Sequence, residues 1–248
     1  MTFRLTARLA LAGLALVMSA TANAAPITAP TGLIVGEQYR LAFITSGVTP
    51  VSSTDIATYD AFVTAQANTI SELAALNTQW RVIGGTASVN LRDHTDTVPS
   101  SVTGGSLGVP IYLLNGVQLV DSYDDLWDGS IDVPLNVDES GATFVSTLYQ
   151  SSVATGSAYG TRDGTTYAGR ELGSASGPIL GDAQRTDVGW AGAVGVPPGG
   201  SYHLYAISDL ITYGAAASGS VPLPTPLMLF GAGLVAATIK RRIRSSGD

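Results

Sequence analysis

The C-terminal 28 residues limit most strongly which part of this chain can form a folded domain. An apolar run in lipid satisfies its backbone hydrogen bonds as a helix, and basic residues next to such a helix prefer the cytoplasmic side. Residues 221–248 therefore predict a transmembrane helix, with the preceding domain outside the inner membrane. They comprise the proline-rich stretch Val221-Pro222-Leu223-Pro224, an apolar run over residues 227–239, and a basic end formed by Lys240, Arg241, Arg242 and Arg244.

The predicted helix is short for a membrane span. Apolar or small residues number thirteen over 227–239, or nineteen counted back to Val221, whereas a spanning helix needs about 20. The alternative is a helix that is buried in the core of the domain. The three consecutive basic residues at its end disfavour this alternative, because charged side chains are almost never fully buried without partners.

The N-terminal 24 residues have the pattern of a secretory signal peptide. Arg4 and Arg8 precede an apolar run over residues 9–18, and small residues then lead to the A-x-A site Ala22-Asn23-Ala24. We expect a signal peptidase to cleave after Ala24. Both ends of the chain therefore predict export.

About 190 residues, 25–214, lie between these segments, enough for one domain with a substantial core, and residues 215–220 are a predicted flexible linker. The chain has 19 acidic and 12 basic residues. One acidic and six basic residues lie in the terminal segments, so the domain keeps 18 acidic and 6 basic residues, a net charge near −12. We expect no nucleic-acid partner, because such a surface repels phosphate backbones. The absence of cysteine excludes thiolate zinc sites and leaves oxygen or histidine ligands for any metal.

Periodicity within the domain predicts an α+β fold with one main helix and many short, mostly antiparallel strands. We expect a half-buried strand over residues 38–45, where apolar side chains alternate, and the main helix over 53–68, with a further turn or two over 72–76. Long loops are expected over 121–141 and 151–200. Further strands are predicted over 80–83, 86–91, 109–114, 118–120, 143–149 and 202–207.

The loop over residues 121–141 is rich in carboxylates, Asp121 and Asp132 among them. Hard cations such as Ca²⁺ bind six to eight oxygen ligands, which a long acidic loop can supply. The spacing does not match the EF-hand pattern, and the alternative is that these acids form turns on a solvated surface. The candidate Ca²⁺ ligands are Asp124, Asp125, Asp128, Asp138 and Glu139, and Asn136 is a candidate ligand-binding residue.

Nucleophilic catalysis finds little support in the sequence. Residues 104–108 match G-x-S-x-G, but a nucleophile elbow needs a strand before the serine and a helix after it, and here a strand is expected to follow. The two histidines, His94 and His203, lack a credible nucleophile and a suitable zinc-ligand spacing. We expect no catalytic residues. A polysaccharide hydrolase with paired carboxylates stays the alternative, because that geometry is set in three dimensions.

The order of proline-rich motif, apolar helix and basic end closely resembles the PEP-CTERM sorting signal, which exosortase-type transpeptidases recognise and cleave in Gram-negative bacteria. The Pro-Glu-Pro core of that family is here Pro222-Leu223-Pro224, with leucine at the acidic position. The resemblance implies a transient stay in the inner membrane and cleavage by an exosortase. It also implies a final place at the cell surface or in the extracellular matrix, associated with exopolysaccharide, biofilm or floc formation.

The chain from Tyr39 to Ser208 resembles secreted bacterial domains of the C-type-lectin-like or endostatin-like fold. This likeness implies a single, non-catalytic lectin-like domain with polysaccharide as a partner, in which Asn136, Asp138 and Glu139 gather sugar or metal contacts. The likeness rests on the motifs FITS (43–46), VPIY (109–112) with Asn115-Gly116, DLWDG (125–129), NVDESG (136–141) and LYAI (204–207).

Aromatic residues have two possible places in such a domain. Trp80, Trp127 and Trp190 are expected in the core. An exposed aromatic side chain, such as Tyr123 or Tyr149, would instead be able to stack on the face of a sugar.

Overall fold

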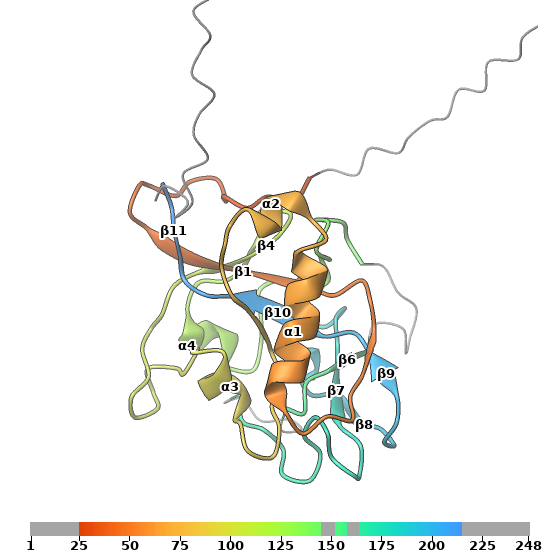
Figure 1. Cartoon of the computed structure of the whole chain (residues 1–248). Helices are drawn as coiled ribbons and strands as arrows, with labels where there is room; N and C mark the ends of the chain where they lie inside the picture. Colours follow the sequence, from red (N-terminus) through yellow and green to blue (C-terminus); the bar gives the residue numbers. More distant parts are fainter. Residues whose placement is uncertain (1–24, 145–151, 158–163, 215–248) are drawn as a thin grey trace, which may run out of the picture. The chain divides into compact units, whose positions relative to one another are not determined.

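Strand β1 (Gln38–Ile44) lies at the centre of the fold and pairs with three other strands (Figure 1). The structure is a computed structural model that describes residues 25–144, 152–157 and 164–214. Within them, β1 belongs to a six-stranded sheet of order β3-β10-β1-β4-β5, and β11 also pairs with β1. The other strands of this sheet are β3 (Trp80–Val82), β4 (Ile111–Leu113), β5 (Gln118–Val120), β10 (Tyr205–Ser208) and β11 (Ile211–Thr212).

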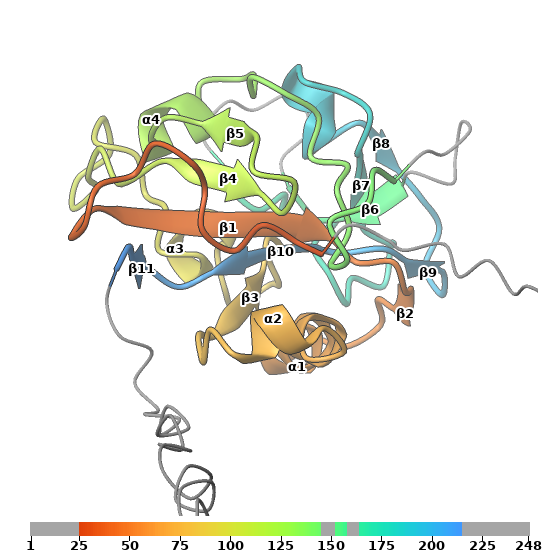
Figure 2. The same cartoon turned by 90° about the horizontal axis from the view of Figure 1, so that it is seen from above.

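The main sheet is mixed, as Figure 2 shows for strands β5, β4, β1, β10 and β3 in that order. Strand β1 runs parallel to β4, with Arg40 opposite Ile111, and antiparallel to β10, with Ala42 opposite Ile207. A parallel pair needs a long crossover connection. The chain between β1 and β4 therefore leaves the centre of the sheet, and it carries the main helix and strand β3.

Helix α1 (Ile56–Ala67) is the main helix, and it packs on β3 through Tyr59, Val63 and Ala67. It begins after Asp55, whose side chain accepts a hydrogen bond from the backbone N–H of Ala57 at 3.0 Å. This contact satisfies one of the unpaired amides of the first turn. The shorter helices are α2 (Ser71–Ala74), α3 (Leu91–His94), α4 (Tyr123–Leu126) and the 3-10 helix Val188–Trp190.

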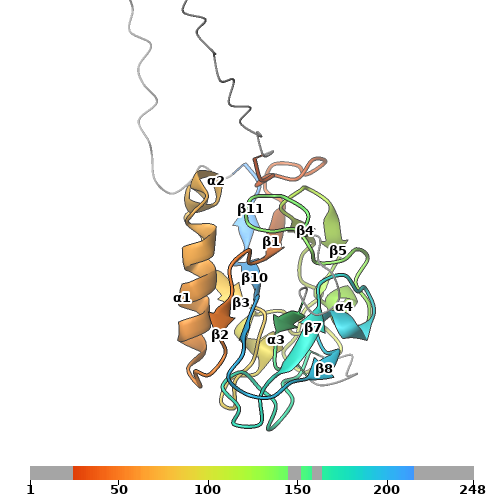
Figure 3. The same ribbon diagram turned by 90° about the vertical axis from the view of Figure 1, so that its right-hand side faces the viewer.

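Two smaller sheets complete the described domain. Figure 3 shows α1 on one side of β3 and β10, and α4 with β7 and β8 on the other side. This second layer explains why both faces of β1 are covered. The smaller sheets pair β2 (Thr49–Pro50) with β9 (Ser201–Tyr202), and β6 (Ser152–Ala154) with β7 (Ile179–Asp182) and β8 (Val194–Gly195).

The three tryptophans lie in the core, as the sequence predicts, with at most 6% of any of them exposed. Trp80 meets Phe43 edge-on at 5.1 Å between ring centroids. Trp127 stacks on Trp190 at 5.6 Å, and Trp190 lies 5.8 Å from Tyr205. These contacts join the α4 region and the 3-10 helix to the main sheet, so one core supports both layers.

The expected half-burial of the first strand is wrong. Every residue of β1 except Gln38 is buried, and Arg40 is only 1% exposed. A neighbouring loop and the second layer cover the face on which Arg40 lies. The guanidinium of Arg40 is paired there by Tyr123 and by backbone oxygens, as buried charged groups require.

Two of the strands predicted from the sequence differ from the structure. The segment 86–91 is not a strand, because Thr86 and Val89 bond to each other in a tight turn and the side chain of Asn90 caps α3. The segment 202–207 is interrupted at His203, so its two ends belong to β9 and β10 in different sheets. The predicted strand 143–149 lies mostly outside the described residues.

The two predicted long loops contain helices and strands that the sequence did not predict. Helix α4 lies in 121–141, and β6, β7, β8 and the 3-10 helix lie in 151–200. By contrast, β5 occupies the predicted residues 118–120, and β3 and β4 lie within their predicted segments. The described residues thus combine few helices with many short, mostly antiparallel strands, as the sequence predicts.

The predicted signal peptide, linker and sorting tail lie outside the described residues, and so do Ala22, Ala24, Val221-Pro222-Leu223-Pro224 and the basic end. Among the helices that the structure does describe, none has the length and hydrophobicity to cross a membrane. The transmembrane helix over the C-terminal residues stays a prediction.

Candidate functional site

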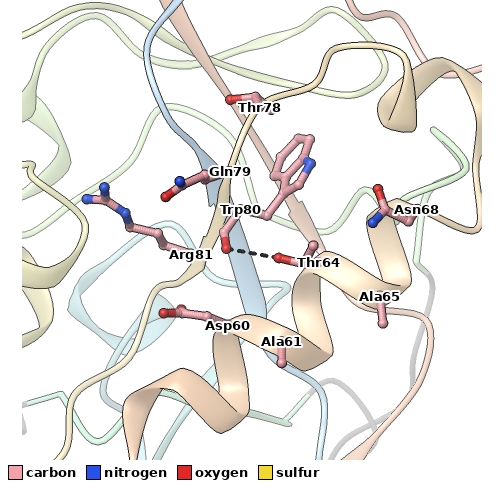
Figure 4. Close-up of a pocket in the computed structure, with 9 residues that line it drawn as sticks. All are labelled: Asp60, Ala61, Thr64, Ala65, Asn68, Thr78, Gln79, Trp80 and Arg81. Atoms are coloured by element: carbon pink, nitrogen blue, oxygen red, sulfur yellow. Dashed lines mark hydrogen bonds between the residues drawn. The ribbon is translucent and has the colours of Figure 1, made fainter.

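An open groove of about 530 Å³ lies between α1 and β3 (Figure 4). The alanines of α1 leave space along one wall because their side chains are short. The opposite wall is the strand and the residues that lead into it. The groove is lined by Asp60, Ala61, Thr64, Ala65 and Asn68 on the helix side and by Thr78, Gln79, Trp80 and Arg81 on the strand side.

Asp60 is held in place from two other elements. Its Oδ1 atom accepts a hydrogen bond from the backbone N–H of Val82 in β3, at 2.9 Å. The same oxygen lies 2.9 Å from Nε2 of His94, at the end of α3. The Asp60 side chain is nevertheless 26% exposed, so a carboxylate of fixed orientation borders the groove.

Arg81 is fixed by the same part of α3. Its Nη1 atom donates to the carbonyl oxygen of His94 at 3.0 Å, and its Nη2 atom lies 3.2 Å from Oδ1 of Asp209, directly after β10. The side chain is 30% exposed. Figure 4 shows Asp60, Gln79 and Arg81 extending toward the same side of the groove. A cation and an anion are therefore presented side by side on rigid elements.

The groove is suited to hydrogen bonding rather than to stacking. The Trp80 side chain is buried against Phe43, and its backbone carbonyl accepts a hydrogen bond from the Thr64 hydroxyl at 3.3 Å. Asn68 and Gln79 are exposed, and each carries an amide donor and an amide acceptor. Together with Asp60 and Arg81, these groups line the groove with several hydrogen-bond donors and acceptors.

The candidate Ca²⁺ ligands of the acidic loop do not converge on one point. Asp124 accepts hydrogen bonds from the backbone N–H and the hydroxyl of Ser100. Asp138 accepts from the backbone N–H of Ser140 and of Ala142, within its own turn. These two carboxylates therefore serve different backbone segments.

Glu139 and Asn136 lie apart from each other as well. Glu139 is 6% exposed, and its two oxygens accept from the backbone N–H and the hydroxyl of Ser46, just after β1. The amide nitrogen of Asn136 donates to the side chain of Gln184 at 3.2 Å. Glu139 thus fastens the acidic loop to the main sheet.

Asp125 is a candidate whose carboxylate lies near other acids, including the candidate Asp128. Its Oδ2 atom accepts from the backbone N–H of Asp121 at 3.0 Å. Burial raises the pKa of Asp125, the hydrogen bond from Asp121 lowers it, and the negative charges of Asp132, Asp121 and Asp128 raise it further. Asp128 itself accepts from the backbone N–H of Ser130 at 2.9 Å.

Across the described ranges, no group of three or more histidine, cysteine or acidic residues is placed to hold a metal ion. The carboxylates described above instead bind backbone amides and hydroxyls. Ca²⁺ binding by this loop stays a prediction.

The expectation that Tyr123 is an exposed aromatic is wrong. Tyr123 is 5% exposed, and its hydroxyl oxygen accepts a hydrogen bond from Nε of Arg40 at 2.8 Å. It therefore holds a buried cation and is not open to a sugar ring. Tyr149 lies outside the described residues.

The motifs considered for catalysis occupy structural positions. Residues 104–108 form a loop that leads to β4, as predicted. His203 Nδ1 lies 2.7 Å from the carbonyl oxygen of Thr45, and its ring meets Phe144 edge-on at 4.7 Å. His94 Nε2 faces a carboxylate rather than a hydroxyl that it could activate.

The sequence did not predict the groove, because the charged residues in and around it come from separate elements. Asp60, Arg81, His94 and Asp209 are far apart in the sequence and lie in or beside α1, β3, α3 and β10. The sequence showed His94 only as part of a polar turn. No local motif joins these residues, and only the pairing of β3 with β10 and the packing of α1 on β3 bring them together.

Comparison of the chain with models of known protein families finds no match, and a search of curated proteins finds no significant relative.

Proposed function

We propose that the chain is an exported, non-catalytic protein of a Gram-negative cell surface or extracellular matrix. In this proposal a signal peptidase removes residues 1–24, the C-terminal helix holds the protein in the inner membrane, and an exosortase releases it by cleavage in the sorting tail. The observation that carries the proposal is the order of the terminal segments around one domain: A-x-A site, domain, Pro222-Leu223-Pro224, apolar run and basic end.

Processing can be tested in a Gram-negative host that has an exosortase. Mass spectrometry of the mature protein is expected to give Ala25 at the N-terminus and a C-terminus near residues 222–225. Changing Pro222 and Pro224 to alanine is expected to leave the unprocessed chain in the inner-membrane fraction. A full-length chain in the cytoplasm with both ends uncut would refute the proposal.

The domain, in the same proposal, is C-type-lectin-like and binds a segment of exopolysaccharide in the groove between α1 and β3. The support is the fixed pair of Asp60 and Arg81, the exposed amide of Gln79 on the same side, and the exposed amide of Asn68 farther along α1 (Figure 4). Hydroxyl-rich ligands pair with such groups through many modest hydrogen bonds. Without an exposed aromatic ring in the groove, we expect weak binding per site and a requirement for a polymer.

Binding can be tested by thermal shift, because a ligand that prefers the folded state raises its melting temperature. A polysaccharide isolated from the host matrix is expected to stabilise the wild-type protein but not the variants Arg81→Ala and Asn68→Ala. The matched control is Arg185→Ala, which removes another partly exposed arginine that pairs with Asp187 outside the groove. Equal stabilisation of all variants would refute the groove as the binding site.

The second candidate function is hydrolysis of a polysaccharide through paired carboxylates. The observation that favours it is Asp125, because a raised pKa is the property of a general acid and three other acids lie near it. The test is release of reducing ends from the same polysaccharide. Turnover that disappears in Asp125→Asn would establish this function in place of the first, whereas absence of turnover in the wild type would exclude it for that substrate.

A further inference from the structure

A turn at one end of the domain exposes two consecutive aliphatic side chains. Ile34 is 68% exposed and Val35 is 79% exposed. The turn is rigid, because Glu37 accepts a hydrogen bond from the backbone N–H of Ile34 at 2.8 Å and Gly36 adopts φ +97°. We call Ile34 and Val35, with this turn, the apolar tip.

The apolar tip is fastened to the end of the domain from which the C-terminal tail leaves. The backbone N–H of Gly36 donates to Tyr213 at 2.9 Å, and the N–H of Tyr213 donates to Glu37 at 2.7 Å. A methyl group placed on Gly214, the last described residue of the domain, would lie 3.1 Å from the Val35 side chain. The tail therefore starts directly beside the tip.

The N-terminal end of the described domain is also on this side of the molecule, as Figures 1 and 3 show. Near that end, Ile27 is 39% exposed, and its side chain lies by Gly116 in the turn before β5. Val117, next to Gly116, is 43% exposed. Ile27 and Val117 lie beside the end of β4, near the end of β1 opposite to the tip, so the tip itself consists of Ile34 and Val35.

The length of the tail limits how far this end can lie from lipid. Twelve residues, 215–226, separate Gly214 from the apolar run. Residues 215–220 are a predicted flexible linker with a root-mean-square extent of about 13 Å, whereas the three prolines of residues 221–226 favour an extended segment of about 19 Å. The net charge of the domain, near −12, makes electrostatic attraction to anionic lipids unfavourable, so a partner of the tip must be recognised by apolar contact.

Two partly buried tyrosines, Tyr112 and Tyr213, and the buried Tyr39 lie near the tip. Tyr112 meets Tyr39 edge-on, with 6.3 Å between the ring centroids. Burial raises the pKa of Tyr112, and the negative charge of Glu37 raises it further. Tyr213 bonds to the turn itself through its backbone. Tyrosines are enriched where a protein surface passes from water into the interfacial region of a membrane.

From these observations we propose that the apolar tip inserts into the interfacial region of the lipid bilayer while the tail holds the unprocessed protein in the membrane. The proposal rests on the proposed function, since it needs the tail to be anchored. It adds that the tip orients the domain, with the tip and the end of β11 facing lipid. Cleavage of the tail would then release the domain, because two aliphatic side chains alone give only marginal binding.

The lack of cysteine allows a direct test with single-cysteine variants of the chain that begins at Ala25 and retains its tail. Val35→Cys and Ile34→Cys would each carry an environment-sensitive fluorophore, in protein reconstituted into phosphatidylcholine vesicles. Val48→Cys is the matched control, because Val48 is an aliphatic residue that is 51% exposed and follows the end of β1 opposite to the tip.

We expect the fluorophore at residues 34 and 35 to shift to shorter wavelength on reconstitution. We also expect it to become several-fold less accessible to iodide and to be quenched by lipids that carry a headgroup spin label. The fluorophore at residue 48 should stay accessible to iodide. The contrast between these positions is the signature of insertion.

Three outcomes would overturn the proposal. Flotation of the protein with the vesicles distinguishes the first from the second, and a measurement without vesicles identifies the third. If the protein does not float with the vesicles, the tail does not anchor it, and the proposed function fails together with the inference. If it floats but the fluorophore at residues 34 and 35 stays accessible to iodide, the inference alone fails. If shielding at these positions occurs equally without vesicles, the tip binds a second copy of the chain instead of lipid.

Discussion

Replacement of Arg40 by methionine removes the most completely buried cation of the described domain. Arg40 is 1% exposed, and its guanidinium donates to five acceptors in three different segments, among them the backbone carbonyl of Asp96 at 3.3 Å. Nε donates to the Tyr123 hydroxyl at 2.8 Å, and Nη1 donates to the carbonyl oxygens of Thr95 at 2.9 Å and Ser208 at 3.1 Å. Nη2 lies 3.4 Å from the carboxylate of Asp96. Methionine would fill similar space without any donor.

The expected loss follows from the oxygens that the change leaves behind. A buried acceptor that loses its donor costs about 1–3 kcal/mol, and removal of one partner from a buried charged network costs about 3–5 kcal/mol in total. The ion pair itself contributes little, because the Asp96 side chain is 75% exposed. We therefore expect Arg40→Met to lower the free energy of unfolding by about 3–5 kcal/mol. For a domain of this size, each kcal/mol corresponds to about 2–4 °C in melting temperature.

The measurement is urea and thermal unfolding, followed by the fluorescence of the buried tryptophans. Arg81→Met is the matched control, since it also removes an arginine from the main sheet. That side chain is 30% exposed and has one acidic partner, so we expect a loss below about 1 kcal/mol. If both variants lose the same amount, the buried oxygens around Arg40 do not depend on its guanidinium, and the reasoning is refuted.

Three further variants or titrations test other features of the domain. Gly108→Ala should cost about 1–3 kcal/mol more than Gly104→Ala in urea unfolding, because both glycines have positive φ but only the added methyl group at residue 108 meets the buried Tyr123 ring; equal losses would contradict this. Asp125→Asn should raise the free energy of unfolding near neutral pH by less than about 1 kcal/mol. Because the pKa of Asp125 is raised in the folded state, its ionisation destabilises the fold as pH rises through that pKa. The gain from the substitution should therefore vanish in acid, below the ordinary pKa of aspartate. Burial raises the pKa of Tyr59 to about 12, so ultraviolet titration should show this phenol ionising later than exposed tyrosines, and the fold should lose stability as pH rises above 10; ionisation of all tyrosines near pH 10 in folded protein would contradict it.

The parts of the fold that sequence predicted correctly are those with a local signal. Helix α1 has apolar residues at helical spacing, so its existence follows from residues within one stretch, but it begins at Ile56, three residues later than predicted, because Asp55 is its cap. Strand β5 follows an Asn-Gly turn and has the predicted bounds. The tryptophans are in the core because large apolar rings gain most from burial.

The parts that sequence failed to predict depend on contacts between distant segments. Strands β6, β7 and β8 have two to four residues each and lie in a glycine-rich region, so they exist only through pairing with one another. The alternation of side chains in β1 predicted that one face of the strand is exposed to solvent, but the second layer covers that face. The signal that could have been used is Arg40 itself, as a lone cation in an otherwise apolar run.

The acidic loop shows why composition alone is a poor guide to a metal site. A domain with long loops and no disulfides must pair many backbone amides that no strand or helix satisfies. Asp124, Asp138 and Glu139 each accept from such an amide, and Glu139 also ties the loop to Ser46, two residues after β1. Ca²⁺ at these carboxylates would compete with hydrogen bonds that hold the loop in place. Asp60 takes its partners from β3 and α3 on one oxygen, and its side chain borders an open groove. On this physical ground the groove is a better candidate for ligand binding than the loop with more carboxylates.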